Sequence, residues 1–183
     1  YSHFLRSYEV SRGYLTSEGN GGNDLFSYGR TFDSGLIPDF SSKEHVSLWD
    51  IGGKINQHIN TEKTQFYGFG NTALYAPTSY LPQAVGIRIA DFFTDRPVVL
   101  AYGGRIANML CFGLIFFLAI HFTPVGKNFI ALLGLVPINI QSANSMSADA
   151  LALALTVAMV VFVLYMRYRE KKVMRKWQLG LMY

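Results

Sequence analysis

An almost uncharged stretch between Arg105 and Arg167 constrains the fold of this chain more than any other feature. Lys127 and Asp149 are the only charged residues inside it, and they leave uncharged runs at residues 106–126, 128–148 and 150–166. An α-helix rises roughly 1.5 Å per residue, so about 17 to 25 apolar residues cross the roughly 30 Å hydrocarbon core of a bilayer. The sequence therefore predicts three transmembrane helices, at about residues 97–122, 128–143 and 149–166.

The basic segment at residues 167–183 predicts the orientation of these helices. Its first ten positions carry six Lys or Arg and one Glu, and cytoplasmic loops are enriched in such cations. We therefore expect this segment and Lys127 in the cytoplasm, and Arg105, Asp149 and the whole of residues 1–96 on the outer side. The expected location is the cytoplasmic membrane, crossed several times.

The balance of charge differs between the two halves of the chain. Residues 1–95 hold 7 Lys and Arg against 10 Asp and Glu, whereas residues 96–183 hold 9 against 2, which gives the net charge of +4. The basic excess lies beside the membrane, where anionic lipid headgroups attract it, so the bilayer is the expected partner and nucleic acid is not. The histidines have no zinc-site spacing and Cys111 has no second cysteine to pair with. No metal site and no cofactor is predicted, and dependence on a divalent metal stays open.

The beginning of the chain carries no targeting segment. Tyr1 is followed by neither a basic region nor an apolar leader, although the residues after it are expected outside. We therefore expect the chain to be part of a longer protein, in which an upstream signal or span carries Tyr1 across the membrane.

The outer region reads as short helices joined by loops. A helix is predicted over residues 3–12, a Gly- and Asn-rich surface loop over 17–39, an amphipathic helix over 41–59, and a helix from Pro82 to about Phe93. An aromatic, Pro-rich passage at residues 65–82 is either a belt at the membrane interface or an aromatic wall for a substrate. The expected fold class is therefore an all-α membrane protein.

Polar residues gather where the predicted helices reach the outer surface. Arg105 either extends its charge to water or meets a phosphate, and Asn108 shares its helix face. Asp149 either stabilises the start of the third helix or acts in a site, because an ionisable group at this depth is costly. The outer end of the second predicted helix carries too many polar groups to face lipid, which are Pro137, Asn139, Gln141, Ser142, Asn144, Ser145 and Ser147.

Four segments of the chain resemble successive motifs of the DUF2142 family. They are residues 3–13, residues 75–86 with the pattern Tyr-x-Pro-x-x-Tyr-Leu-Pro, residues 105–108, and residues 137–149 with the pattern Ser-x-Ser-x-Asp. Members of this family are bacterial multi-pass membrane proteins similar to the GT-C glycosyltransferases. The resemblance thus implies that the chain is a fragment of a larger GT-C-like fold.

The resemblance also implies an activity, the transfer of a sugar from a polyprenyl-phosphate donor to an extracytoplasmic glycan or lipid acceptor. Asp149 would then support catalysis, while donor or acceptor contacts would come from His3, Arg6, Tyr75, Tyr80, Arg105, Asn108, Gln141, Ser145 and Ser147. The family usually has an acidic pair just before the position of His3, where this chain has Tyr1 and Ser2. The alternative is a non-enzymatic membrane component that binds or transports lipid-linked glycans.

Overall fold

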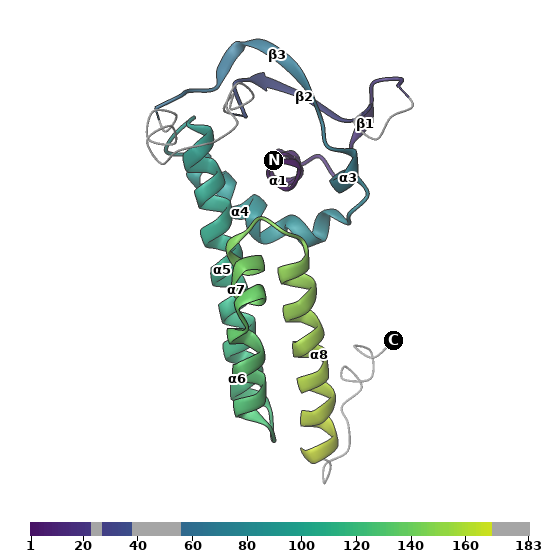
Figure 1. Ribbon diagram of the computed structural model, residues 1–183, viewed down its shortest axis with the longest axis vertical. Helices are drawn as coiled ribbons and strands as arrows, with labels where there is room; N and C mark the ends of the chain where they lie inside the picture. Colours follow the sequence, from purple (N-terminus) through teal and green to yellow (C-terminus); the bar gives the residue numbers. More distant parts are fainter. Residues whose placement is uncertain (23–26, 38–55, 170–183) are drawn as a thin grey trace.

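The computed structural model describes residues 1–22, 27–37 and 56–169. It has an outer region, built of a small sheet and short helices, that sits at one end of a bundle of longer helices (Figure 1). The predicted helix over residues 41–59 lies mostly outside the described residues, and the last residues of that range, 56–59, are not helical.

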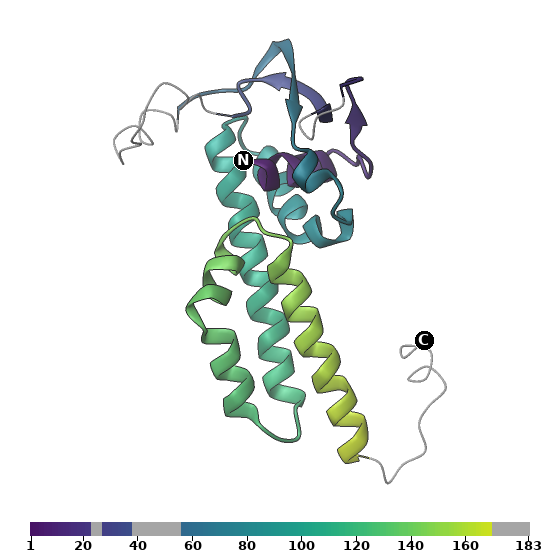
Figure 2. The same cartoon turned by 45° about the vertical axis from the view of Figure 1, so that its right-hand side comes forward.

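Within the part of the chain that the structure describes, two helices are long and apolar enough to cross a membrane. They are α5, Pro97–Phe122, and α8, Asp149–Arg169, and they run side by side through the bundle (Figure 2). The helix α5 has the bounds expected for the first transmembrane helix, because Pro97 suits the first turn and Thr123 leaves the helical conformation at the other end. The helix α8 begins at Asp149, as expected for the third.

The second predicted span is not one continuous helix. It is divided into α6, Lys127–Leu135, and α7, Pro137–Asn144, each too short to cross a bilayer alone. Val136 is extended, as expected for a residue before proline. The carbonyl of Leu133 accepts a 2.7 Å hydrogen bond from the side chain of Asn139, in addition to a longer one, at 3.4 Å, from the backbone N–H of Val136. Together α6 and α7 return the chain to the level of the outer region (Figure 2).

The structure is mostly helical, as predicted, but the outer region also contains a small sheet that the all-α prediction missed. Strands β1, Glu18–Gly19, β2, Tyr28–Ser34, and β3, Asn60–Gly68, form an antiparallel sheet in the order β1-β2-β3. Two of these strands lie in the stretch predicted as a loop. A Cβ added to Gly29 would lie 1.9 Å from the carbonyl oxygen of Tyr67, so only glycine allows β2 and β3 to pair here.

Short helices fill the space between this sheet and the bundle. They are α1, Ser2–Ser11, α3, Gly70–Ala73, the 3-10 helix η2, Pro77–Tyr80, and α4, Leu81–Asp91. The predicted helices over residues 3–12 and from Pro82 are thus confirmed within two residues at each end. One cluster of buried side chains joins α1 to the sheet and to the bundle, and includes Leu5, Phe32, Ile87, Leu100 and Met146.

The crossing of α4 over α5 fixes the outer region on the membrane helices. A Cβ on Gly86 would lie 2.3 Å from the carbonyl oxygen of Gly103, and a Cβ on Gly103 would lie 2.8 Å from the Cβ of Ala90 and 2.9 Å from the carbonyl oxygen of Gly86. Since side chains larger than hydrogen cannot fit at either glycine, the two backbones approach each other closely. The pocket described next depends on this rigid contact.

Candidate functional site

A pocket of about 460 Å³ lies where the outer region meets the bundle. Its walls come from the start of α1, from the residue Leu36 that follows β2, from the first turns of α5, and from the connection between α7 and α8. The lining residues are Tyr1, His3, Phe4, Leu36, Pro97, Val98, Ala101, Tyr102, Arg105, Ser145 and Met146. Three predicted site residues, His3, Arg105 and Ser145, are therefore brought to one pocket.

The imidazole of His3 is held by a buried tyrosine. The Nδ1 atom of His3 lies 2.9 Å from the hydroxyl of Tyr80, whose side chain is completely buried. Because Tyr80 is enclosed, it positions His3 and does not itself reach the pocket. Tyr75 packs against both rings, at centroid distances of 6.3 Å from His3 and 6.5 Å from Tyr80.

Burial keeps these groups neutral near pH 7. It lowers the pKa of His3, and the negative charge of Asp149 partly offsets this effect. Burial, followed by the neighbouring Tyr75, raises the pKa of Tyr80. The hydroxyl of Tyr80 therefore keeps its proton. In the tautomer in which this phenol donates to Nδ1, the neutral His3 ring carries its proton on Nε2.

Arg105 supplies the cation that lines the pocket. It is exposed, and its guanidinium lies 5.4 Å from the centre of the Tyr102 ring, one helical turn earlier on α5. This stacking restricts the side chain while its N–H donors stay available. A planar guanidinium on an aromatic face is well suited to bind a phosphate.

Asp149 is exposed at the first turn of α8 and is bonded locally. The hydroxyl of Ser147 donates to its carboxylate at 2.8 Å and accepts from its backbone N–H at 3.2 Å. This arrangement caps the start of α8, as one of the two interpretations of the sequence expects. The carboxylate remains accessible, and its charge is felt by both His3 and Tyr80.

Asn108 stabilises the corner between α7 and α8 and is not free to bind a ligand. Its side chain is buried and donates 3.0 Å hydrogen bonds to the carbonyls of Ala143 and Ser145. Carbonyls at the end of a helix otherwise lack partners, which is costly within a membrane. Gln141 is exposed on α7 and does not line the pocket.

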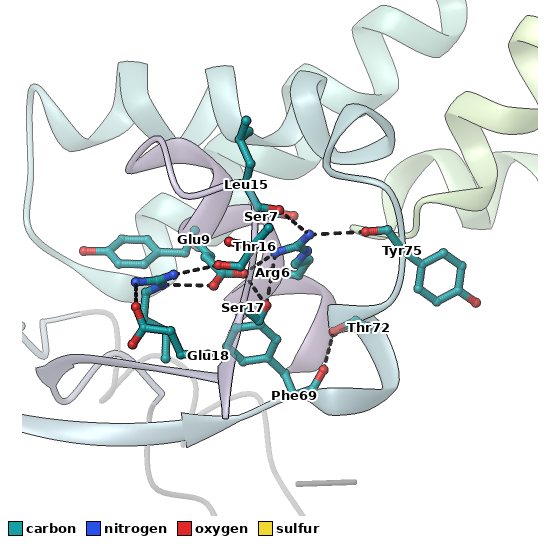
Figure 3. A network of polar contacts seen from close by, with 12 residues as sticks. Arg6, Ser7, Glu9, Leu15, Thr16, Ser17, Glu18, Phe69, Thr72 and Tyr75 are labelled. Carbon is teal, nitrogen blue, oxygen red and sulfur yellow. Dashed lines mark hydrogen bonds and ion pairs between the residues drawn. The ribbon is translucent and has the colours of Figure 1, made fainter. Parts of the chain in front are cut away.

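Arg6 also points away from the pocket, into a buried ionic network (Figure 3). It pairs with Glu9, and Glu9 also accepts hydrogen bonds from Ser17 at 2.8 Å and from Arg30 at 3.0 Å. The Nη1 atom of Arg30 donates a 2.6 Å hydrogen bond to the carboxylate of Glu18. Arg6 further donates to the backbone carbonyls of Leu15 and Tyr75, at 3.0 and 3.3 Å. The network thus ties α1 to the loops around it.

The sequence did not point to every residue of the pocket or of this network. The spacing of Arg6 and Glu9, three apart on a helix, is a signal for their pairing. Tyr102, three residues before Arg105, is detectable in the same way. Leu36 carries no local signal, since only the fold brings it to the pocket. Among the described residues, no group of three or more His, Cys, Asp or Glu is placed to hold a metal ion.

The model of one protein family matches the chain over residues 1–183. That family is DUF2142, described as predicted membrane proteins. Because the match spans the whole sequence, the chain belongs to this family. No curated protein and no solved structure matches it.

Proposed function

We propose that this DUF2142 protein is part of an integral membrane glycosyltransferase of the GT-C type, located in a bacterial cytoplasmic membrane. It would move a sugar from a polyprenyl-phosphate donor to an extracytoplasmic glycan or lipid acceptor. The proposal rests on the pocket between the outer region and the bundle, which we call the junction pocket. Arg105 and His3 both line this pocket, at one end of the candidate membrane helix α5. In this assignment α6 and α7 together form a third, broken crossing.

The position of the pocket suits a substrate that is half lipid and half polar. A polyprenyl chain partitions into the bilayer, so its phosphate and sugar are presented at the membrane surface. Arg105 would bind the phosphate and stabilise the negative charge that grows on it as the sugar leaves. The Nε2–H of His3 would donate a hydrogen bond to a phosphate or sugar oxygen.

Asp149 is assigned a supporting role in this reaction. Attack by an acceptor hydroxyl requires a group that orients it or accepts its proton, and a carboxylate can do either. Asp149 is an accessible carboxylate near the site, since its charge influences the pKa of both His3 and Tyr80. The hydroxyls of Ser145 and Ser147 lie at the same corner and would contact the acceptor.

A second candidate function is binding or transport of a lipid-linked glycan without chemistry. The described residues that line the pocket include no carboxylate, and this observation favours it. The same pocket and the same phosphate contact would serve both functions, so only the fate of the bound donor distinguishes them.

The test is sugar transfer by the full-length protein in proteoliposomes that contain a polyprenyl-phosphate sugar. The change Arg105→Gln should raise the KM for the donor at least tenfold, because a hydrogen bond to a charged group contributes about 1.5 to 3 kcal/mol. The change Asp149→Asn should lower kcat while donor binding persists.

Each possible result of this test decides which function the pocket serves. Full transfer by the Asp149→Asn protein would limit Asp149 to its helix-capping role. Tight binding of the donor by the wild-type protein, without any transfer to a range of acceptors, would favour the second candidate. Unchanged kinetics in the Arg105→Gln protein would remove the pocket from both functions.

A further inference from the structure

Helix α4 carries an apolar stripe that none of the described residues covers. Leu81, Val85 and Ile89 recur every four residues and are 50%, 56% and 59% exposed. Phe92 and Phe93 continue the stripe just beyond the helix, at 85% and 78%. Four-residue spacing places side chains on one face of an α-helix. Isolated exposed apolar residues are ordinary, but five on one face form a surface that needs a partner.

The other sides of α4 are occupied and define where this stripe points. Gly86 and Ala90 face α5, as the close approach to Gly103 shows. Asp91 faces α1, since its carboxylate accepts a 3.0 Å hydrogen bond from Arg12. At about 100° per residue, Ile89 lies on the side of the helix opposite Asp91. The stripe therefore faces away from α1 and the outer sheet.

Helix α4 lies at the level where the outer region meets the bundle of long helices. The helix lies across the end of the bundle, with the outer sheet on one side and the membrane helices on the other (Figures 1 and 2). On α5, Ile106 and Leu110 flank the contact with α4 and are 56% and 65% exposed. The apolar stripe of α4 thus lies next to exposed apolar residues of α5, which is long and apolar enough to cross a membrane.

Charged and aromatic groups on α4 are arranged as at a membrane surface. Arg88 is 62% exposed and lies at the edge of the stripe, between Leu81 and Asp91, so that this edge forms a charged side; its guanidinium is 3.4 Å from the Asp91 carboxylate. Phe92 and Phe93 pack edge to face, with ring centres 5.2 Å apart. An interfacial helix has this division between a charged and an apolar side.

We propose that α4 is an interfacial helix whose apolar stripe inserts into the outer lipid leaflet, beside the junction pocket. This anchor would hold the pocket at a fixed depth relative to lipid headgroups. The inference is independent of the proposed function, because a lipid-inserted α4 serves an enzyme and a binding protein equally.

The test uses spin labels on single cysteines in the full-length protein, reconstituted into phosphatidylcholine and phosphatidylglycerol vesicles after Cys111→Ser. Labels replace Ile89 and Phe93, which lie within the stripe, and Arg88, which is similarly exposed on the charged side. Power saturation compares collisions with oxygen, which concentrates in lipid, and with a water-soluble nickel chelate. None of the three changes removes a buried side chain, so folding should be retained.

We expect oxygen collisions to dominate at positions 89 and 93 and nickel collisions to dominate at position 88. Nickel collisions that dominate at all three positions would place the stripe in water and overturn the inference. Labels at 89 and 93 that are immobile and shielded from both reagents would show that protein covers the stripe, which also overturns it. The same labels in detergent, where lipid is absent, control for the fold.

Discussion

Truncating Glu9 should loosen α1 far more than its single side chain suggests. The carboxylate is completely buried and pairs with Arg6, whose side chain is 2% exposed, and with Arg30, at 12%. The change Glu9→Ala leaves the buried charge of Arg6 without a carboxylate partner, whereas Arg30 keeps its ion pair with Glu18. Removing one partner of a buried ion pair typically costs about 3 to 5 kcal/mol.

The exposed end of the same network supplies a matched control. Glu18 also pairs with Arg30, at 2.6 Å, but its side chain is 65% exposed. A surface ion pair contributes about 0 to 1 kcal/mol. The change Glu18→Ala therefore removes the same kind of group from the same network at little expected cost.

Amide hydrogen exchange of the full-length protein in lipid nanodiscs measures both changes locally. Since about 1.4 kcal/mol corresponds to a tenfold change in an equilibrium, a cost of about 3 to 5 kcal/mol should accelerate exchange in α1 of the Glu9→Ala protein by roughly 100- to 4,000-fold. Glu18→Ala should accelerate it less than about tenfold. Equal acceleration in both variants would refute the idea that the buried charges hold α1 in place, and would make Arg6 available again as a ligand.

Three further outcomes follow from the packing and from the charges. Gly86→Ala should destabilise the detergent-solubilised protein by about 1 to 3 kcal/mol through overpacking, whereas Gly113→Ala, which meets nothing within 4 Å, should not; thermal inactivation compares them. Because the pKa of His3 is lowered from 6.5, the unfolded chain takes up its proton first as the pH falls. Stability should therefore decrease from about pH 6.5 down to the lowered pKa, and His3→Gln should remove that slope. In an NMR titration, Asp149→Asn should lower the pKa of His3 further, and a rise would contradict the assigned electrostatics.

The membrane helices were predictable because their signal is continuous and local. Charges and Pro97 bound α5, and Asp149 opens α8, so composition alone locates both. Pro137, where the helix breaks, is evident in the sequence. The sequence does not show that the side chain of Asn139 forms a hydrogen bond with a backbone carbonyl at this break. A broken helix and a continuous helix with a polar end therefore have similar sequence patterns.

The sheet escaped prediction for a different reason. Strand β3 is exposed along most of its length, so it lacks the alternation of apolar and polar residues that marks a half-buried strand. Its partner β2 lies about 30 residues earlier, and Gly29 and Asp33 suggest a loop. Only pairing across that distance, at Gly29 against Gly68, reveals both as strands.

The predicted site residues fall into two groups, those that line the pocket and those that bond within the protein. His3, Arg105 and Ser145 were expected and do share a pocket. Tyr80 and Asn108 carry polar groups that the sequence suggested for ligand contacts, but both are buried and bond to the protein instead. A polar residue at the right depth can serve the site or the fold, and only its partners decide.

The most direct test of the central claim is binding of a polyprenyl phosphate to the full-length protein, measured by native mass spectrometry from nanodiscs. Arg105→Gln is compared with Arg88→Gln, an exposed arginine on α4 outside the pocket. The account predicts that Arg105→Gln weakens binding at least tenfold, while Arg88→Gln leaves it within about twofold. Equal binding by both variants and the wild type would contradict the assignment of the junction pocket to a lipid-linked phosphate.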